Sequence, residues 1–274
     1  MTIVAISSEL GSRGIQIGRG VAETLGFEFV DREIILQAAG KYDVQVEKLA
    51  QVDERRLSFW ERFDEEKRRY LIFIESALLS FAEKGNVVIR GRGAPLLLRE
   101  VAHALRIRIM APFEVRVERV MEEEGLDQKA AWARVKAFDR EQAARLEYLF
   151  GVDWRSPEHY DLVVNTLRGA FQAYVDLIVH AAKGEPYRPT PESLQKIRDL
   201  SLAARVRASL AADPVLGHLP IEVKARGGAV TLRGVVFSPA TMDLAAQVAK
   251  RVEGVTSVTS EVVEVPRIYP GPLM

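Results

Sequence analysis

A short glycine-rich segment near the N-terminus constrains the fold of this 274-residue chain more than any other feature. The apolar run Ile3-Val4-Ala5-Ile6 leads into Gly11-Ser12-Arg13-Gly14, and apolar residues then recur at helical spacing as far as Leu25. A second apolar run covers residues 27–30. Strand, turn, helix and strand in this order open a phosphate-binding α/β fold, because the turn directs backbone N–H groups and the positive end of a helix at an anion.

The turn lacks the lysine that such phosphate-binding segments usually carry. They end in Gly-Lys-Ser or Gly-Lys-Thr, whereas this chain has Gly14-Ile15-Gln16. Arg13 is the only side chain of the turn that can replace the missing charge, and Ser12 can add a hydroxyl. Gln16 stands where a hydroxyl would hold magnesium. If the segment is more than a tight connection, phosphoryl transfer here requires arginines supplied from other segments.

Arginines follow two of the predicted strands at their carboxyl ends, where open α/β sheets bind ligands. Asp31-Arg32 comes after the second strand, and Arg92 stands between two glycines after an apolar run at residues 87–89. Further candidates lie in the helical tract 114–150, and they are Arg116, Arg119, Asp139, Arg140 and Arg145. These side chains either form an exposed helix face with weak ion pairs or close over phosphate groups.

Predicted strands and helices alternate through the first two thirds of the chain. Besides the opening segments, apolar runs predict strands at residues 87–89, 105–110 and 161–165, and helical spacing predicts helices at 70–82, 114–150 and 171–182. The charge-rich residues 43–69 predict solvated helices. This alternation indicates a parallel sheet that is covered by helices on both faces.

A proline-rich segment divides the chain into two predicted domains. Residues 184–191 cannot continue a helix, so we expect a linker at 188–195 between a first domain, 1–187, and a second, 196–266. The second domain reads as a small α+β unit of αββαβ order, with a helix at 194–212, strands at 221–225 and 229–232, a helix at 240–252 and a strand at 257–265. Residues 267–274 are predicted to be a poorly ordered tail.

Composition excludes several classes of function. The 38 basic and 38 acidic residues leave no charge excess that would indicate a nucleic-acid partner. The absence of cysteine excludes disulfides and thiol chemistry, and the four histidines lack metal-ligand spacing, so no metal site built by the protein is predicted. Without a signal peptide or a run of about 20 apolar residues, the chain is predicted to be cytoplasmic.

Several segments of the first domain occur in an order that is typical of one family. They are Ile6 to Gly14, Leu25 to Arg32, Val88 to Ala94, Ala111 to Arg119, Asp139 with Arg145, Gly151 to Arg155, and Tyr160 to Thr166. This ordered set resembles the cytidylate kinase-like family, relatives of bacterial cytidylate kinase among the P-loop nucleoside monophosphate kinases. In the lid pattern Arg-Asp-x-x-Asp-x-x-Arg of cytidylate kinase, Phe138 and Gln142 replace the first arginine and the second aspartate.

The resemblance implies a P-loop kinase-like domain that phosphorylates a nucleoside monophosphate, such as CMP, with ATP and Mg²⁺. It implies donor-phosphate binding by Gly11, Ser12, Arg13, Gly14 and Gln16, acceptor binding by Asp31, Arg32 and Arg92, and charge neutralisation during transfer by Arg13, Arg116, Arg119, Arg140 and Arg145. Since the P-loop lysine is absent, a nucleotide-binding regulator without transferase activity remains an alternative.

The second domain resembles a BON domain. The matching segments are Leu202 to Val206, Ala212-Asp213-Pro214, Ile221 to Val236, and Val252 to Val258. This resemblance implies that the domain binds a small ligand or a phospholipid in a sensory or docking role. A phospholipid-binding adaptor, in which this domain carries the function, is therefore the second alternative. A homo-oligomer is compatible with the sequence.

Overall fold

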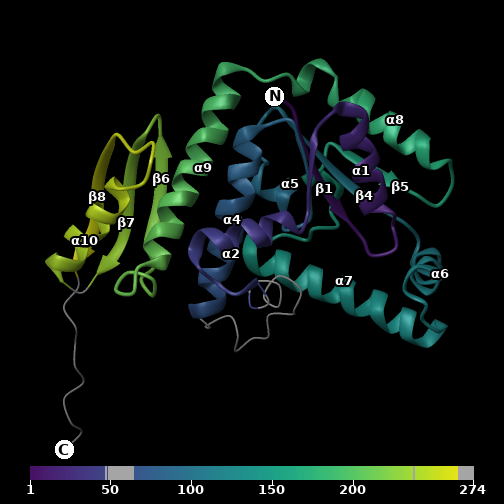
Figure 1. The fold of residues 1–274 in the computed structure, drawn as a ribbon, viewed down its shortest axis with the longest axis horizontal. Helices are drawn as coiled ribbons and strands as arrows, with labels where there is room; N and C mark the ends of the chain where they lie inside the picture. The colour runs from purple at the N-terminus through teal and green to yellow at the C-terminus, as the bar shows by residue number, and fades with distance from the viewer. Residues whose placement is uncertain (47, 49–64, 237, 265–274) are drawn as a thin grey trace, which may run out of the picture.

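The computed structural model describes residues 1–46, 48, 65–236 and 238–264 (Figure 1). Its first unit contains β1 (Ile3–Ser8), α1 (Gly14–Leu25), β2 (Glu28–Val30), α2 (Glu33–Tyr42), α4 (Glu65–Lys84), β3 (Val87–Arg90), α5 (Ala94–Leu97), β4 (Ala104–Met110), α6 (Phe113–Glu124), α7 (Gln128–Phe150), β5 (Leu162–Asn165) and α8 (Phe171–Ala182). Most of the solvated helices predicted within residues 43–69 lie outside the described residues. Among the described residues, no helix is both long enough and apolar enough to cross a membrane.

Five parallel strands form the sheet of the first unit, in the order β2-β3-β1-β4-β5. The central strand β1 is buried along its whole length, because it pairs on one side with β3 and on the other with β4. Alternate residues of β1 pack against opposite helical layers. Ile3 and Ala5 face α2, α4 and α5, whereas Val4 and Ile6 face α1 and α8. The predicted parallel sheet with helices on both faces is confirmed.

The predicted helical tract at 114–150 consists of two helices. Helix α6 ends at Gly125, which adopts a left-handed conformation with φ 67°. Asp127 then caps α7, since its side chain accepts a hydrogen bond of 2.8 Å from the Ala130 amide. A glycine after the last turn and an aspartate before the next helix are strong signals for a helix end and a helix start. The expectation of one continuous tract was therefore wrong at these positions.

The second unit has the predicted αββαβ order. It comprises α9 (Pro191–Ala212), β6 (Glu222–Arg226), β7 (Ala229–Val236), α10 (Pro239–Lys250) and β8 (Ser257–Glu264). Strands β6 and β7 are antiparallel, and β8 lies parallel to β7. Helix α9 starts at Pro191, where Thr190 caps it, so its first turn lies within the predicted linker 188–195. The predicted tail, 267–274, lies outside the described residues.

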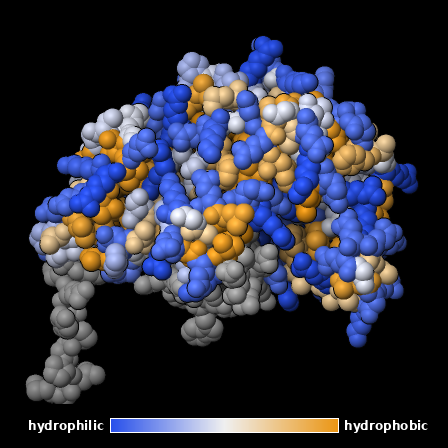
Figure 2. All heavy atoms as spheres, in the orientation of Figure 1, coloured by the Kyte–Doolittle hydropathy of each residue, from blue (hydrophilic) through white to orange (hydrophobic). Residues whose placement is uncertain are grey.

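Helix α9 belongs to the hydrophobic cores of both units. Ile197, Ala204, Ala208 and Ala211 pack into the core beside α4, whereas Leu202, Ala203, Val206 and Leu210 pack under the three-stranded sheet. Figure 1 shows α9 standing between the two sheets. On the face shown in Figure 2, hydrophilic side chains surround small apolar areas over both units. The two units are consequently joined by a packed interface rather than by a flexible tether.

Candidate active site

The glycine-rich turn packs tightly between β1 and α6. Gly11 has φ 73°, and a Cβ atom at this position would lie 2.6 Å from the carbonyl oxygen of Arg116. A Cβ atom on Gly14 would lie 2.3 Å from the Cβ of Ser8. Only glycine fits at either position without a shift of the surrounding backbone or strand. The sequence therefore folds here into a close loop at the carboxyl end of β1.

The start of α1 offers amide groups to an anion. The first helical hydrogen bond of this region runs from the Ile17 amide to the Arg13 carbonyl at 3.0 Å, so the amides of residues 14–16 have no partner within the helix. Three N–H groups together with the positive helix end fit a phosphate group. The other polar groups are engaged elsewhere. The Ser12 hydroxyl donates to the Glu9 carbonyl at 2.6 Å inside the turn, and Gln16 Nε2 donates to Glu123 on α6 at 3.1 Å.

Arg13 and Arg119 bring two positive charges to the turn. Arg13 is exposed and adopts a left-handed conformation with φ 64° just before α1. Arg119, on α6, donates to the Gly11 carbonyl at 3.1 Å and to the Thr166 carbonyl at 2.7 Å. Burial, and next the charge of Arg13, lower the pKa of Arg119. The two guanidinium groups therefore share one region beside the turn, although the sequence separation gives no sign of this.

Arg116 lies beneath the turn rather than facing solvent. Its guanidinium group donates to both carboxylate oxygens of Asp139 at 2.9 and 2.7 Å, and its Nε lies 3.3 Å from a carboxylate oxygen of Glu9. Glu9 also accepts a hydrogen bond of 2.7 Å from Arg108 on β4. Arg116, Arg108 and Glu9 are all buried. This ion-pair network fixes the turn to α6 and α7. Glu9 and Arg108 were not among the residues predicted for the site.

A cavity of about 220 Å³ opens beside the turn at the ends of β2 and β3. It is lined by Ser8, Ile15, Asp31, Arg32, Arg90, Gly91, Arg92, Arg134, Phe138, Glu141, Gln142 and Arg145. We call it the arginine cavity. It brings together the predicted residues Asp31, Arg32, Arg92 and Arg145. Arg140 is exposed and is not among its lining residues.

Asp31 organises two of the arginines in this cavity. Its carboxylate accepts a hydrogen bond of 3.0 Å from Arg90 and pairs through its other oxygen with Arg92. The Nε of Arg90 also donates to the Ser8 hydroxyl at 2.9 Å, which ties β3 to β1. Arg90 was missed as a site residue because it is the last residue of a buried strand. Its position at a strand end, two residues before Arg92, is the signal that could have identified it.

The loop after β3 directs Arg92 toward Asp31. Gly91, Arg92 and Gly93 all have positive φ, at 82°, 52° and 72°. This succession of left-handed residues is costly except at glycine, and it turns the chain sharply into α5. A Cβ atom on Gly93 would lie 2.6 Å from the ring of Phe150. The Gly-Arg-Gly sequence is therefore required by the turn itself, and the arginine is the member whose side chain enters the cavity.

Gln142 contributes a buried amide to the arginine cavity. The residue is only 7% exposed, its Nε2 lies 3.5 Å from the Ser7 hydroxyl, and its Oε1 has no hydrogen-bond partner. A buried carbonyl without a hydrogen-bond partner costs free energy, and this one is available to a ligand in the cavity. Gln142 lies three residues after Asp139 and three before Arg145, so helical spacing was the signal that could have placed it on the same face of α7.

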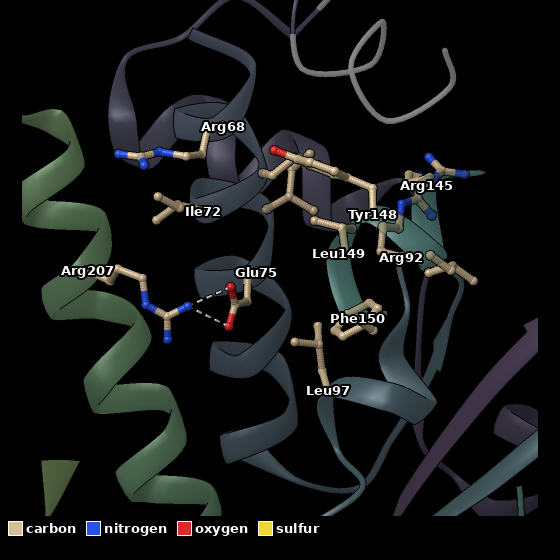
Figure 3. Close-up of a pocket in the computed structure, with 13 residues that line it drawn as sticks. Arg68, Ile72, Glu75, Arg92, Leu97, Arg145, Tyr148, Leu149, Phe150 and Arg207 are labelled. Atoms are coloured by element: carbon tan, nitrogen blue, oxygen red, sulfur yellow. Dashed lines mark hydrogen bonds and ion pairs between the residues drawn. The ribbon is translucent and has the colours of Figure 1, made fainter. Parts of the chain in front are cut away.

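A second cavity, of about 390 Å³, adjoins the arginine cavity and shares Arg92 and Arg145 with it (Figure 3). We call it the apolar cavity. Its apolar wall is formed by Leu71, Ile72, Ile74, Leu97, Leu146, Leu149 and Phe150, with Tyr148 beside them. Glu75 on α4 and Arg207 on α9 face each other across one side. A charged compartment thus lies next to a compartment with an apolar and aromatic lining.

Comparison with known proteins matches both units. The model of the cytidylate kinase-like family covers residues 3–168, and the model of the BON domain covers residues 198–266. The cytidylate kinase of Methanopyrus kandleri is 28% identical over 175 residues, which are 61% of this chain and 85% of that protein. The cytidylate kinase of Pyrococcus horikoshii is 27% identical over 164 residues, which are 60% of this chain and 79% of that protein.

A solved structure shares the fold of the first unit. The crystal structure of an uncharacterized protein from Eubacterium ventriosum covers 68% of this chain and 100% of its own, with a TM-score of 0.53 at 20% identity. The predicted kinase-like unit is thus supported by the family model, and its backbone fold is shared with that solved structure. Because the first family model spans more than half of the chain, this protein belongs to the cytidylate kinase-like family, and a BON domain follows the kinase-like unit.

Proposed function

We propose that the first unit transfers a phosphoryl group from ATP to a nucleoside monophosphate. The arginine cavity beside the amide-lined turn is the observation that carries this proposal. Five arginines line it, and Asp31 holds two of them in place. Arginine forks match the geometry of phosphate, and their charge suits an acceptor phosphate. An oxygen of that phosphate would attack the γ-phosphorus of ATP, while the bond between the γ-phosphorus and the bridging oxygen breaks and ADP leaves.

The two cavities suit the two ends of a nucleoside monophosphate. The phosphate would lie among Arg32, Arg90 and Arg92, and the nucleoside would extend into the apolar cavity beside Tyr148 and Phe150. Their shared residues, Arg92 and Arg145, would stand at the junction of phosphate and sugar. A pocket of about 390 Å³ with an apolar wall and charged groups at its edges falls within the range of small-molecule sites.

The donor phosphates would bind at the turn. The amides of residues 14–16 would hold them, while Arg13 and Arg119 would supply the charge that a P-loop lysine ordinarily supplies. Arg140 and Arg145 on α7 are proposed to approach the transferring group. Arg116 is proposed as a positioning residue, because Asp139 and Glu9 already match its charge.

Mg²⁺ is proposed as the cofactor, carried by the nucleotide. Among the described residues, no three carboxylate or histidine side chains lie close enough together to hold a metal ion. The amide-rich turn nevertheless fits phosphate groups, and Mg²⁺ commonly binds through substrate phosphates and water. When bound there, the ion would neutralise charge on the phosphate oxygens.

Purified protein with ATP, Mg²⁺ and a panel of nucleoside monophosphates tests the proposal. We expect one of them, with CMP as the first candidate, to be converted to its diphosphate, and Arg13→Ala to reduce ATP binding or turnover. Absence of turnover with every common monophosphate would reject the transferase. Binding of ATP without product would support the alternative, a nucleotide-binding regulator, which the missing lysine and the engaged Gln16 side chain favour.

A further inference from the structure

A third cavity lies at the junction of the two units, remote from the proposed active site. It has a volume of about 400 Å³, and its polar lining comes from α2, from α9 and from the end of α10. Lys41 belongs to the kinase-like unit, Arg205 and Ser209 belong to α9, and Arg251 and Glu253 follow α10. No residue of this junction cavity lines the arginine cavity or the apolar cavity.

Positive charge accumulates in the junction cavity without a matching set of carboxylates. Lys41, Arg205 and Arg251 stand against Glu253 alone among the lining residues, which leaves a formal excess of two positive charges. None of these three cations forms an ion pair with a carboxylate in the part of the chain that the structure describes. Lys41 and Arg251 are exposed and Arg205 is partly buried, so an anion from solvent can reach all three cations, and its charge would be attracted by them.

Two further features indicate that the cluster is poised for a ligand. The Nε of Arg205 is buried and has no hydrogen-bond partner in the described structure. Burial, and then the charge of Arg205, lower the pKa of Lys41, while the more weakly acting carboxylate of Glu83 opposes this shift. Lys41 and Arg205 therefore lie within electrostatic range of each other.

From this juxtaposition we propose that the junction cavity binds a phosphomonoester group. Such a group carries about two negative charges near neutral pH, which matches the excess of the cavity, and it offers three oxygens that guanidinium and ammonium donors can share. A bound phosphate would contact α2 of the first unit and α9 of the second. It would therefore brace the contact between the kinase-like unit and the BON domain. The phosphate can belong to a soluble metabolite or to a lipid headgroup.

Titration of the full-length protein at low ionic strength tests this site. The probes are glycerol 3-phosphate and vesicles of phosphatidylcholine that contain phosphatidic acid. We expect Arg205→Gln and Arg251→Gln each to weaken binding at least tenfold. Lys250→Gln is the matched control, since Lys250 is an exposed cation next to Arg251 that does not line the cavity, and its affinity should stay within twofold of the wild type.

The experiment distinguishes binding at the junction cavity from binding at the active site. It also distinguishes a soluble ligand from a lipid. Because the arginine cavity is also proposed to hold phosphate, each titration is repeated with Arg92→Gln, in which the junction binding should persist. Binding of glycerol 3-phosphate alone indicates a soluble ligand, and binding of the vesicles alone indicates a lipid. The proposal is overturned if neither probe binds, if Lys250→Gln weakens binding as much as Arg251→Gln, or if Arg92→Gln abolishes it.

Discussion

The Nη1 atom of Arg207 lies 3.0 and 2.9 Å from the two carboxylate oxygens of Glu75, which joins α9 to α4 across the interface of the two units. Both side chains are partly buried, with 31% and 24% of their surfaces exposed. The same pair forms one side of the apolar cavity. An element that starts the BON unit thus helps to build a cavity of the kinase-like unit.

Replacing Arg207 should weaken this interface. Arg207→Met removes one partner of a partly buried ion pair, so we expect the free energy of unfolding to fall by about 1 kcal/mol. Thermal and denaturant unfolding measure the effect. Lys224→Met is the control, because its pair with Glu222 is more than half exposed and should contribute less than about 0.5 kcal/mol. Equal losses in the two variants would contradict a special role for the Arg207 pair.

Charge at residue 119 should support donor binding. Arg119→Gln is expected to lower kcat/KM for ATP by about 10²-fold, since a preorganised cation beside the triphosphate would be lost. Arg119→Lys keeps the charge, so it should restore most of the ATP affinity, although it loses the two-pronged contact with Gly11 and Thr166. A lysine variant as impaired as the glutamine variant would assign Arg119 a purely structural role. Lys129→Gln, an exposed substitution on α7, is the control.

Loss of Arg92 should weaken binding of the acceptor nucleotide rather than binding of ATP. A charge-assisted hydrogen bond contributes roughly 1.5–3 kcal/mol, so Arg92→Gln is expected to raise the KM of the nucleoside monophosphate by at least tenfold. Arg106→Gln is the matched control, because Arg106 is also a partly buried arginine on the sheet that pairs with an aspartate, Asp161. Steady-state kinetics with each substrate varied in turn measure the two KM values. An unchanged KM for the nucleoside monophosphate in Arg92→Gln would contradict the assignment.

Replacing Gln142 should affect stability and acceptor binding differently. Gln142→Leu removes a buried carbonyl without a partner, so the free energy of unfolding should stay unchanged or rise. The acceptor should nevertheless bind several-fold more weakly, because the amide that faces the arginine cavity is lost. Calorimetry and acceptor titration measure the two effects. A clear loss of stability with normal acceptor affinity would instead make Gln142 a structural partner of Ser7.

Stability should decline below about pH 6.5 because of His103. This residue is 1% exposed, its Nδ1 lies 2.8 Å from the Ser193 hydroxyl, and burial lowers its pKa. The unfolded chain binds a proton at its ordinary pKa of about 6.5, whereas the folded chain takes up that proton only at lower pH. Stability from this group is therefore complete above that value and decreases as the pH falls. His103→Gln should flatten the dependence, and exposed His218→Gln should leave it unchanged.

Periodicity and turn chemistry predicted the framework of the fold. The apolar run from Ile3 to Ile6 became the central strand, since a strand covered on both faces needs apolar residues at every position. Gly227 and Gly228 formed the hairpin turn between β6 and β7, with φ 57° and 89°. The break after Gly125 was missed because the apolar spacing continues on both sides of it, although the glycine and Asp127 carry the signal.

Side-chain contacts between residues far apart in the sequence could not be predicted from the sequence. Arg116 and Arg119 were predicted from the sequence to act on phosphate. Nothing local indicates that Arg116 pairs with Asp139 and Glu9 beneath the turn, or that Arg119 contacts Gly11. These contacts depend on how α6 packs against the turn. The candidate site was thus predictable as a set of residue types at strand ends, but the division into buried supports and cavity-facing groups required the packed structure.

The double-sided packing of α9 has a consequence for dissecting this protein. A fragment that stopped at residue 190 would lose Ile197 and Ala204 from the core beside α4 and would expose that apolar surface to water. A fragment that began there would present the same side chains to solvent. Either fragment should therefore aggregate and fold poorly, because a boundary near residue 190 cuts through a shared apolar interface.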